Sequence, residues 1–399
     1  MSKVNTRGYV LFAITVMLVG LNLRPIMAAI GPVLARIQHD TGIGDTAAGL
    51  LTTLPVLAMG LFAFMGGTLQ RILGVERTVL YGLLALGGAT LARLPFHGES
   101  GLIVTATIGG IGIAVIQAAL PGRIKRDHGE KAGQLMSLYT VGIMGGAMLS
   151  SSLVAPLSDM GGWPLALSVW TAFAVLAVLG WRLVSAPRSG AGDTGGARLP
   201  VRSGRAWYLL VFFGIGTAAY TLVLAWLPPF YVRLGWSDTA SGLLLGGLTL
   251  AQVVAAVGLS SVVDRFPDRR PVLYAILTII ALGLISLIVA PGPLAIPALL
   301  LLGLGIGGLF PMSLIIAVDH LQAARQAGAL LGFVQGGGYV IASVMPFLAG
   351  LLRGAFDDLT PAWGIMLAGI LVLLAMVPVL SPGHSLSSED WRLQHAGTS

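Results

Sequence analysis

The sequence predicts an all-α membrane protein in which twelve transmembrane helices form two pseudo-symmetric six-helix bundles. Three observations lead to this class. Of the 399 residues, 56% are hydrophobic and only 10% are charged, whereas ordinary soluble domains carry about 25% charged residues. Apolar stretches long enough to cross a bilayer, which takes roughly 20 residues, recur along the whole chain. Short motifs in the first half also return in the same order in the second half.

The predicted spans fall into two sets of six. In the first half they cover residues 9–35, 46–70, 78–95, 102–122, 132–156 and 163–184, and in the second half residues 206–232, 240–263, 271–290, 294–318, 327–351 and 362–381. The stretch between the sets is basic and rich in Gly and Ser, which is typical of a flexible linker. We therefore expect an N-terminal bundle over residues 1–184, a cytoplasmic linker over 185–204, a C-terminal bundle over 205–382 and a cytoplasmic tail over 383–399.

The basic residues orient the chain. With the N-terminus inside, the inner segments hold 18 of the 23 Lys and Arg residues, the outer loops hold Arg36, Arg93, Arg233 and Arg353, and Arg24 lies within a span. This asymmetry follows the positive-inside rule and puts both termini in the cytoplasm. Because the basic residues are spread over seven short segments rather than one face, we expect the lipid bilayer as a partner and no nucleic acid.

A heptapeptide shows the internal repeat. The sequence D-T-A-A-G-L-L starts at Asp45 and opens the second span, and D-T-A-S-G-L-L starts at Asp238, 193 residues later, and opens the eighth. Arg36 likewise matches Arg233, at an offset of 197. Each half has an even number of spans, so both have the same orientation. We expect an axis along the membrane normal to relate them, with a substrate site near the midplane.

Arg24 is the charged residue that lies deepest in a predicted span. A guanidinium at this depth costs from about 3 kcal/mol to about 10 kcal/mol or more, so we expect it to face a wet cavity or a partner. Pro25 deprives the helix of one N–H, frees the carbonyl of Leu21 and favours a kink. The planar fork of Arg24 suits a carboxylate or another planar anion, so we expect Arg24 to bind the substrate. The alternative is that Arg24 stacks on an aromatic ring or binds carbonyls of the broken helix.

Further polar side chains lie at membrane depth and are candidates for substrate binding. They are Asn22, Gln117, Tyr139, Thr140, Tyr220, Thr221, Gln252, Gln335 and Tyr339. Thr221 corresponds to Arg24 through the offset of 197. For each of these residues, hydrogen bonding between helices is the alternative role.

Several classes of protein are excluded by what the sequence lacks. There is no cysteine, and the six histidines and all acidic residues fall in loops or at span ends, so neither a nucleophile–base pair nor a metal cluster can form in the bilayer. We expect no enzyme activity, no metal and no cofactor. The glycine runs lie in mid-membrane and lack a following Lys-Ser/Thr, which argues against an ATP-driven pump. The absence of a deep carboxylate favours facilitated movement, anion exchange, or symport in which the proton travels on the substrate.

The segment between spans 2 and 3 resembles the cytoplasmic motif G-x-x-x-D-R-x-G-R-R of the major facilitator superfamily. It reads G-G-T-L-Q-R from residue 66, followed by Gly74 and Arg77, and the second copy reads S-S-V-V-D-R-F-P-D-R-R from residue 260. The resemblance implies a cytoplasmic gate formed by Gln70, Arg71, Arg77, Asp264, Arg265 and Arg269. Gln70 stands where the family has Asp, so the first copy lacks one ion pair. The alternative is that these arginines only determine topology.

Within that superfamily, the run Asn22-Leu23-Arg24-Pro25 followed by Gly31-Pro32 is similar to the bacterial cyanate/2-nitroimidazole transporter family. The resemblance implies a monomeric transporter in the bacterial inner membrane that moves a small anion or nitrogen heterocycle by alternating access, with Arg24 at the central site. It also implies that spans 4, 5, 7, 8 and 11 line the cavity. Two alternatives stay open: a proton-coupled drug exporter, because residues 155–163 loosely resemble an antiporter motif, and a receptor that binds without transport.

Overall fold

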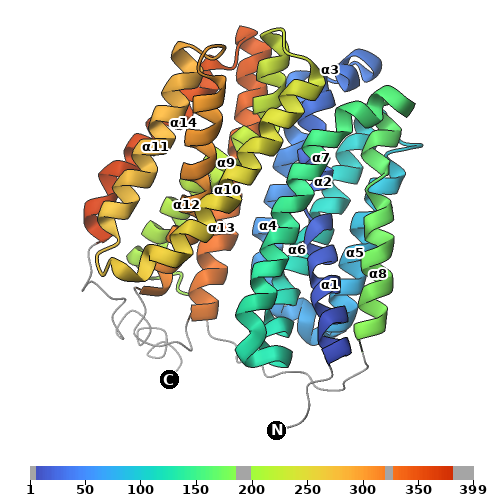
Figure 1. The fold of residues 1–399 in the computed structure, drawn as a ribbon, viewed down its shortest axis with the longest axis vertical. Helices are drawn as coiled ribbons and strands as arrows, with labels where there is room; N and C mark the ends of the chain where they lie inside the picture. Colours follow the sequence, from blue (N-terminus) through green and yellow to red (C-terminus); the bar gives the residue numbers. More distant parts are fainter. Residues whose placement is uncertain (1–5, 186–198, 320–326, 381–399) are drawn as a thin grey trace. The chain divides into compact units, whose positions relative to one another are not determined.

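The computed structural model describes residues 6–185, 199–319 and 327–380, and in these ranges it contains helices and turns and no strand (Figure 1). Within them, the side chains of residues 6, 66–68, 70, 260, 262, 264 and 327 are also outside the description.

The first half of the chain contains eight α-helices. They are α1 (Thr6–Asn22), α2 (Pro25–Ala28), α3 (Ile30–Thr41), α4 (Asp45–Leu73), α5 (Val75–Ala92), α6 (Glu99–His128), α7 (Ala132–Ser168) and α8 (Thr171–Val184), with a 3-10 turn, η1 (Gly129–Lys131), before α7. The second half contains α9 (Gly204–Arg233), α10 (Asp238–Val262), α11 (Arg270–Val289), α12 (Ala295–Asp319), α13 (Ala327–Phe356) and α14 (Thr360–Met376), with 3-10 turns η2 (Val263–Arg265) and η4 (Val377–Leu380).

Each of the twelve predicted spans coincides with a helix or a set of helices. Nine stretches of the described residues are long and apolar enough to cross a membrane. One of them, Glu99–Val184, contains three predicted spans, so the nine stretches cover eleven, and α5 supplies the twelfth. The predicted all-α membrane class is confirmed.

Glycine ends the fifth span inside α7. Gly161 has φ −151° and ψ 17°, and Gly162 has φ 80° and ψ 159°, so the helix is interrupted here. A positive φ is easily reached only by glycine. The sixth span starts after this kink, with Trp163 and Pro164, and continues into α8.

The first span is broken at Arg24. Leu23 donates its N–H to the Gly20 carbonyl at 3.0 Å, three residues back, and α1 ends at Asn22. Pro25 then starts the one-turn helix α2, with Arg24 in its N-cap position at φ −112° and ψ −26°. Proline at the first position of a helix loses no hydrogen bond. The related helix of the second half, α9, continues from Gly204 to Arg233 as one element.

The chain forms two compact units. One contains Met1–Thr194 and Leu224–Gly247, and the other contains Gly195–Val223 and Leu248–Ser399. In the first unit α1 packs against α7 and α8, and α4 and α5 both pack against α6 (Figure 1). In the second unit α11 and α13 each pack against α12 and α14. The bundle boundaries given above stay a prediction.

Glycines bring the backbones of α1 and α7 together beside the break. A methyl group on Gly142 would lie 2.4 Å from the Met17 carbonyl oxygen, and one on Gly146 would lie 2.1 Å from the Leu21 carbonyl oxygen. Leu21 is the residue whose carbonyl Pro25 leaves without its usual N–H donor. Only glycine therefore fits at Gly146 without a shift of α1 or α7.

Candidate functional site

Arg24 lies at the junction of α1 and α2 and is 6% exposed. Its own carbonyl accepts N–H groups from Met27 at 3.0 Å and Ala28 at 2.9 Å, which fixes the first turn of α2. Its neighbours Leu23 and Ile26 are buried apolar residues. The cation is thus built into the first bundle at the point where the helix is interrupted.

The other first-half candidates divide by burial. Asn22 is buried, and its Nδ2 donates to the Leu18 carbonyl at 2.7 Å. Tyr139 is buried on α7, and its carbonyl lies next to Gly20, one turn before Arg24. Gln117 is half-buried on α6. Asn22 and Tyr139 are therefore both buried on helices that pack against each other, α1 and α7.

Thr140 and Thr221 make local contacts within their units. Thr140 is exposed, and its hydroxyl donates to the Met136 carbonyl of the same helix at 3.0 Å. Thr221 is 1% exposed, and its hydroxyl lies 2.9 Å from the Ala342 carbonyl, so it connects α9 to α13. This is the contact between helices that the sequence left open as the alternative for Thr221.

Three candidates of the second unit lie on α9 and α13. Tyr220 and Gln335 are half-buried. Tyr339 is buried and packs edge-on against Phe213, with ring centroids 5.7 Å apart.

Gln252 on α10 differs from the other candidates of the second unit. Its side chain is 4% exposed, and neither Nε2 nor Oε1 has a hydrogen-bond partner among the described residues. Buried amide groups without partners are costly, at about 1–3 kcal/mol per group. Among the described residues, the buried amide of Gln252 therefore lacks hydrogen bonds that a solute could supply.

The predicted cytoplasmic gate is described only in part. Arg71, Arg77 and Arg265 are exposed. Arg269 donates from Nε to Asp319 Oδ2 at 3.1 Å, and from Nη1 to the carbonyls of Val263 and of Phe266, the latter at 2.7 Å. The side chains of Gln70 and Asp264 lie outside the described residues, so the gate stays a prediction.

Arg123 forms an ion-pair cluster that the sequence analysis missed. It is 4% exposed; its Nη1 lies 2.5 Å from Glu76 Oε1 and its Nε 3.0 Å from Asp127 Oδ2. Its guanidinium lies 5.2 Å from the centroid of the Trp181 ring. The sequence treated Arg123 only as a topology charge, although its i, i+4 spacing to Asp127 was a signal of pairing.

A neighbouring ion pair returns in the second unit with its signs reversed. Glu76 of α5 lies 3.6 Å from Arg126 of α6. Arg269 lies 3.1 Å from Asp319 at the corresponding place before α11 and in α12. The offsets are 269 − 76 = 193 and 319 − 126 = 193. The repeat predicted from the sequence therefore extends to an ion pair.

The burial of Arg93 was not predicted from the sequence. Arg93 was counted with an outer loop, and it does follow the last residue of α5, but it is 0% exposed. Its Nη1 donates to the Ile26 carbonyl at 2.9 Å, and its Nε lies 3.5 Å from Thr105 Oγ1. Burial arises because α2 and α6 both cover the end of α5, a tertiary contact that hydropathy does not report.

Arg36 connects three helices of the first unit. Its Nε lies 2.6 Å from Asp238 Oδ2 in α10, and its Nη1 lies 2.7 Å from Asp159 Oδ1 and 3.1 Å from Ser158 Oγ in α7. We call these four residues the Arg36 cluster. Around it the helices approach closely, since a methyl group on Gly242 would lie 2.2 Å from the Ser151 carbonyl oxygen.

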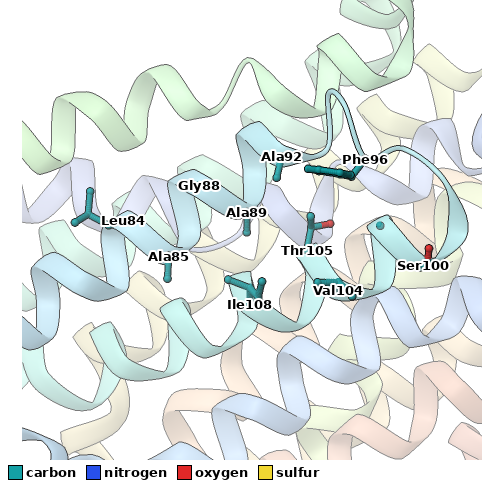
Figure 2. A pocket seen from close by; sticks show the side chains of 11 residues that line it. Leu84, Ala85, Gly88, Ala89, Ala92, Phe96, Ser100, Val104, Thr105 and Ile108 are labelled. Atoms are coloured by element: carbon teal, nitrogen blue, oxygen red, sulfur yellow. The ribbon is translucent and has the colours of Figure 1, made fainter.

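An apolar groove of about 500 Å³ lies between α5 and α6 (Figure 2). Side chains of both helices face it, among them Leu84 and Ala89 of α5 and Val104 and Ile108 of α6. Leu84 and Val104 are about half exposed. The groove contains none of the predicted site residues, and its apolar lining matches a surface that meets lipid chains.

Comparisons with known proteins identify the family. The Major Facilitator Superfamily profile matches residues 10–342 and, in a second match, residues 233–390. The cyanate transport protein CynX of Escherichia coli (strain K12) is 34% identical over 377 residues, covering 92% of this chain and 98% of CynX. The 2-nitroimidazole transporter of the same organism is 30% identical over 375 residues, covering 91% of this chain and 92% of that protein.

Solved structures show the same fold at low sequence identity. The crystal structure of the nucleoside transporter NupG matches with a TM-score of 0.72 at 11% identity, covering 94% of this chain and 98% of that chain. A bacterial homolog of the human lysosomal transporter Spinster, in an inward-facing and unoccupied conformation, matches with a TM-score of 0.72 at 14% identity, covering 98% and 99%. The resemblance noted from the sequence is confirmed: the chain is a transporter, not an enzyme, and belongs to the Major Facilitator Superfamily.

Proposed function

We propose that this chain moves a small compact solute across the bacterial inner membrane by alternating access, and that Arg24 binds the solute directly. The solute is a small anion, such as cyanate or a small carboxylate, or a small nitrogen heterocycle. The two relatives named for their substrates handle cyanate and 2-nitroimidazole. Both compounds are small and present hydrogen-bond acceptors to a donor group.

The burial of Arg24 at the helix break is the observation that carries the proposal. A guanidinium offers five N–H donors in a planar fork, and a cyanate, carboxylate or nitro group can accept from it. Arg24 is 6% exposed and lies in the N-cap position of α2, at the helix break. An anionic or electron-rich solute that reaches this position would meet a cation in an otherwise apolar part of the chain.

Gln252 supports the same proposal from the second unit. A neutral amide without hydrogen-bond partners among the described residues can donate to one atom of a solute and accept from another. Such a group adds orientation without adding charge. We therefore assign Gln252 a substrate contact as well, and we give Thr221 a structural role because its hydroxyl already connects α9 to α13.

The Arg36 cluster supports alternating access. With the predicted orientation, its end of the helices faces the outside of the cell. The cluster ties the start of α10 to α3 and α7, so opening of the site to the outside requires the Arg36–Asp238 contact to break. Rocking of one repeat against the other is the usual motion of carriers built from two repeats.

The coupling mechanism follows from the same charges. A carrier that binds protons itself usually needs a titratable group at membrane depth. The buried polar side chains of the described residues include arginines but no carboxylate. We therefore propose facilitated movement, exchange, or symport in which the proton travels on the solute.

Counterflow in proteoliposomes tests this function. Purified protein is reconstituted, and uptake of labelled cyanate and of 2-nitroimidazole is measured against an internal pool of the same compound. Arg24→Ala should abolish counterflow, and Arg24→Lys, which keeps the charge and loses the fork, should reduce it about tenfold or more. Unchanged counterflow in Arg24→Ala would refute the role of Arg24. Binding without counterflow in the native protein would identify a receptor instead.

A further inference from the structure

Arg93 is a further buried guanidinium in the first unit, and the proposed function does not yet use it. Its side chain is completely buried. Among the described residues no carboxylate lies within 4.0 Å of it, because none of the ion pairs found there includes Arg93. A buried cation without a carboxylate is costly. A protein that keeps one has a use for its hydrogen bonds.

The hydrogen bonds of Arg93 lead to the broken helix. Nη1 donates to the carbonyl of Ile26, the second residue of α2, at 2.9 Å. A one-turn helix cannot satisfy all of its own carbonyls, so the guanidinium supplies a donor that the short helix lacks. Nε lies 3.5 Å from Thr105 Oγ1, whose own hydrogen points to the Leu102 carbonyl at 3.0 Å. Arg93 therefore joins α2 to α6.

The side chain of Ile26 makes a second contact with α6. A methyl group placed on Gly109 would lie 2.0 Å from Ile26 Cδ1, so Ile26 fills the space above that glycine. Ile26 is 1% exposed. Backbone and side chain of Ile26 are thus both fixed, and Arg24 lies two residues before it. The position of α2 sets the direction in which Arg24 leaves the backbone.

The second half of the chain has neither a buried arginine at the position of Arg93 nor a helix break at the position of Arg24. The residue related to Arg24 is Thr221 (24 + 197), and the residue related to Arg93 is Ser286 (93 + 193). The hydroxyl of Ser286 donates to the Leu282 carbonyl of its own helix at 2.8 Å. The helix α9 is not broken near Thr221. The buried arginine at the end of α5 therefore occurs in the copy that has a broken helix and a substrate-binding arginine.

We propose that Arg93 is a positioning residue for transport: it holds α2 through the Ile26 carbonyl and so orients Arg24 toward the solute. This inference rests on the proposed function of Arg24. Arg93 itself does not touch the solute. Arg93 acts on the solute indirectly: it fixes the backbone at Ile26, and Arg24 lies two residues before Ile26 in the chain.

The test compares Arg93→Met, which keeps the length and the apolar packing, with Arg93→Gln and Arg93→Lys, which keep a donor. Counterflow kinetics of each folded variant give KM and maximal rate separately. Arg93→Met should raise KM for cyanate about tenfold or more, since small misplacements of a binding group are costly. Arg93→Gln and Arg93→Lys should recover part of the affinity. The matched control Ser286→Ala should leave KM unchanged.

Two outcomes separate this inference from the proposed function. A loss of counterflow in Arg24→Ala together with an unchanged KM in all folded Arg93 variants overturns the positioning role alone. Unchanged counterflow in Arg24→Ala overturns both. If Arg93→Met does not fold, the KM values of the other proteins decide. A KM that is lowest in the native protein, higher in Arg93→Lys and highest in Arg93→Gln supports the positioning role. Equal KM values in all three proteins overturn it.

Discussion

The Nε of Arg36 lies 2.6 Å from the Oδ2 of Asp238, so an arginine of the first repeat binds a carboxylate at the start of the second repeat's second span. Asp238 is the residue that the repeat relates to Asp45, and Arg36 is the residue that it relates to Arg233. The side chains of Arg36 and Asp238 are 34% and 15% exposed, so solvent weakens the pair without removing it. The contact is formed at the end of the molecule that we expect to face outward.

Breaking this ion pair should favour the outward-open state. We expect Arg36→Asp or Asp238→Arg to increase outside labelling of a reporter cysteine at Ser152→Cys by about fivefold, the change produced by roughly 1 kcal/mol. Ser152 suits this purpose because it lies against α10: a methyl group on Gly246 would lie 2.1 Å from the Ser152 Oγ. The chain has no cysteine of its own, so a single introduced cysteine is the only thiol that can be labelled. The double reversal Arg36→Asp with Asp238→Arg should restore low labelling. Asp159→Asn is the control, since Asp159 binds Arg36 from α7 and should leave labelling unchanged.

The repeat predicts a counterpart of this pair. If a two-fold axis relates the two copies, Arg233 and Asp45 should form the equivalent contact. We therefore expect Asp45→Arg and Arg233→Asp to increase labelling at the same reporter, and the double reversal to reverse the effect. The Arg36–Asp238 pair could control labelling while the Arg233–Asp45 pair does not. That result would show that the two halves of the chain do not form equivalent contacts at the outer end.

Gly146 should tolerate no side chain. We expect Gly146→Ala to lower the free energy of unfolding by about 1–3 kcal/mol, as overpacking does, because the added methyl group meets the Leu21 carbonyl oxygen. The neighbouring Gly145→Ala is a matched control, since a methyl group there meets nothing within 4 Å and alanine favours the helix by up to about 1 kcal/mol. Thermal unfolding in detergent measures both. Equal effects of the two substitutions would contradict the close approach of α1 and α7.

Glu76 should stabilise the first bundle through Arg123. We expect Glu76→Gln to lower the free energy of unfolding by roughly 1–3 kcal/mol, less than for a fully buried pair, because Glu76 is 24% exposed and Asp127 still binds Arg123. The control is Asp268→Asn, which breaks an exposed pair with Arg270 (37% and 35% exposed) and should lower the stability less than Glu76→Gln does, because solvent screens an exposed pair. Chemical denaturation of the two variants in the same detergent measures the difference. A larger loss in Asp268→Asn would show that burial of Arg123 does not matter.

Asp40 should make stability depend on pH on the acid side. A hydrogen bond from His39, and then one from the Trp163 indole at 2.9 Å, lower the pKa of the Asp40 carboxyl below its ordinary value. Because the pKa is lower in the folded protein, the stabilisation is present above an ordinary carboxyl pKa of about 4 and is lost as pH falls through the folded value. The melting temperatures of native protein and Asp40→Asn should therefore differ at pH 6 and converge below about pH 4. A constant difference over this range would exclude ionised Asp40 as the cause.

The features that the sequence predicted are those that depend on local chemistry. The spans follow from hydropathy, and the break follows from Pro25, whose missing N–H acts at its own position. The repeat motifs at Asp45 and Asp238 predicted two related halves, and the motif from residue 66 carried the resemblance to the family. Burial of Arg24 was predicted from its depth in the first span and is confirmed.

The features that the sequence missed depend on packing between distant helices. Arg93 lies beside a loop in the sequence, and contacts with both α2 and α6 make it a buried residue. For Thr221 the sequence left two roles open, and only the approach of α13, which brings the Ala342 carbonyl to its hydroxyl, favours the contact between helices. For Gln252 the sequence showed only a polar residue in a span. The structure adds that its amide is buried and has no hydrogen-bond partner among the described residues. The gate positions Gln70 and Asp264 stay predictions.

The first span is interrupted at Arg24, whereas the related helix α9 is continuous. Because of this difference, neither half of the chain could take the place of the other. A tandem chain made from two second copies would still have twelve apolar segments, but it would contain no cation in mid-membrane. A chain made from two first copies would contain two such cations, which would repel each other. The two halves therefore differ at the position on which the proposed solute binding rests, so neither half could replace the other in that role.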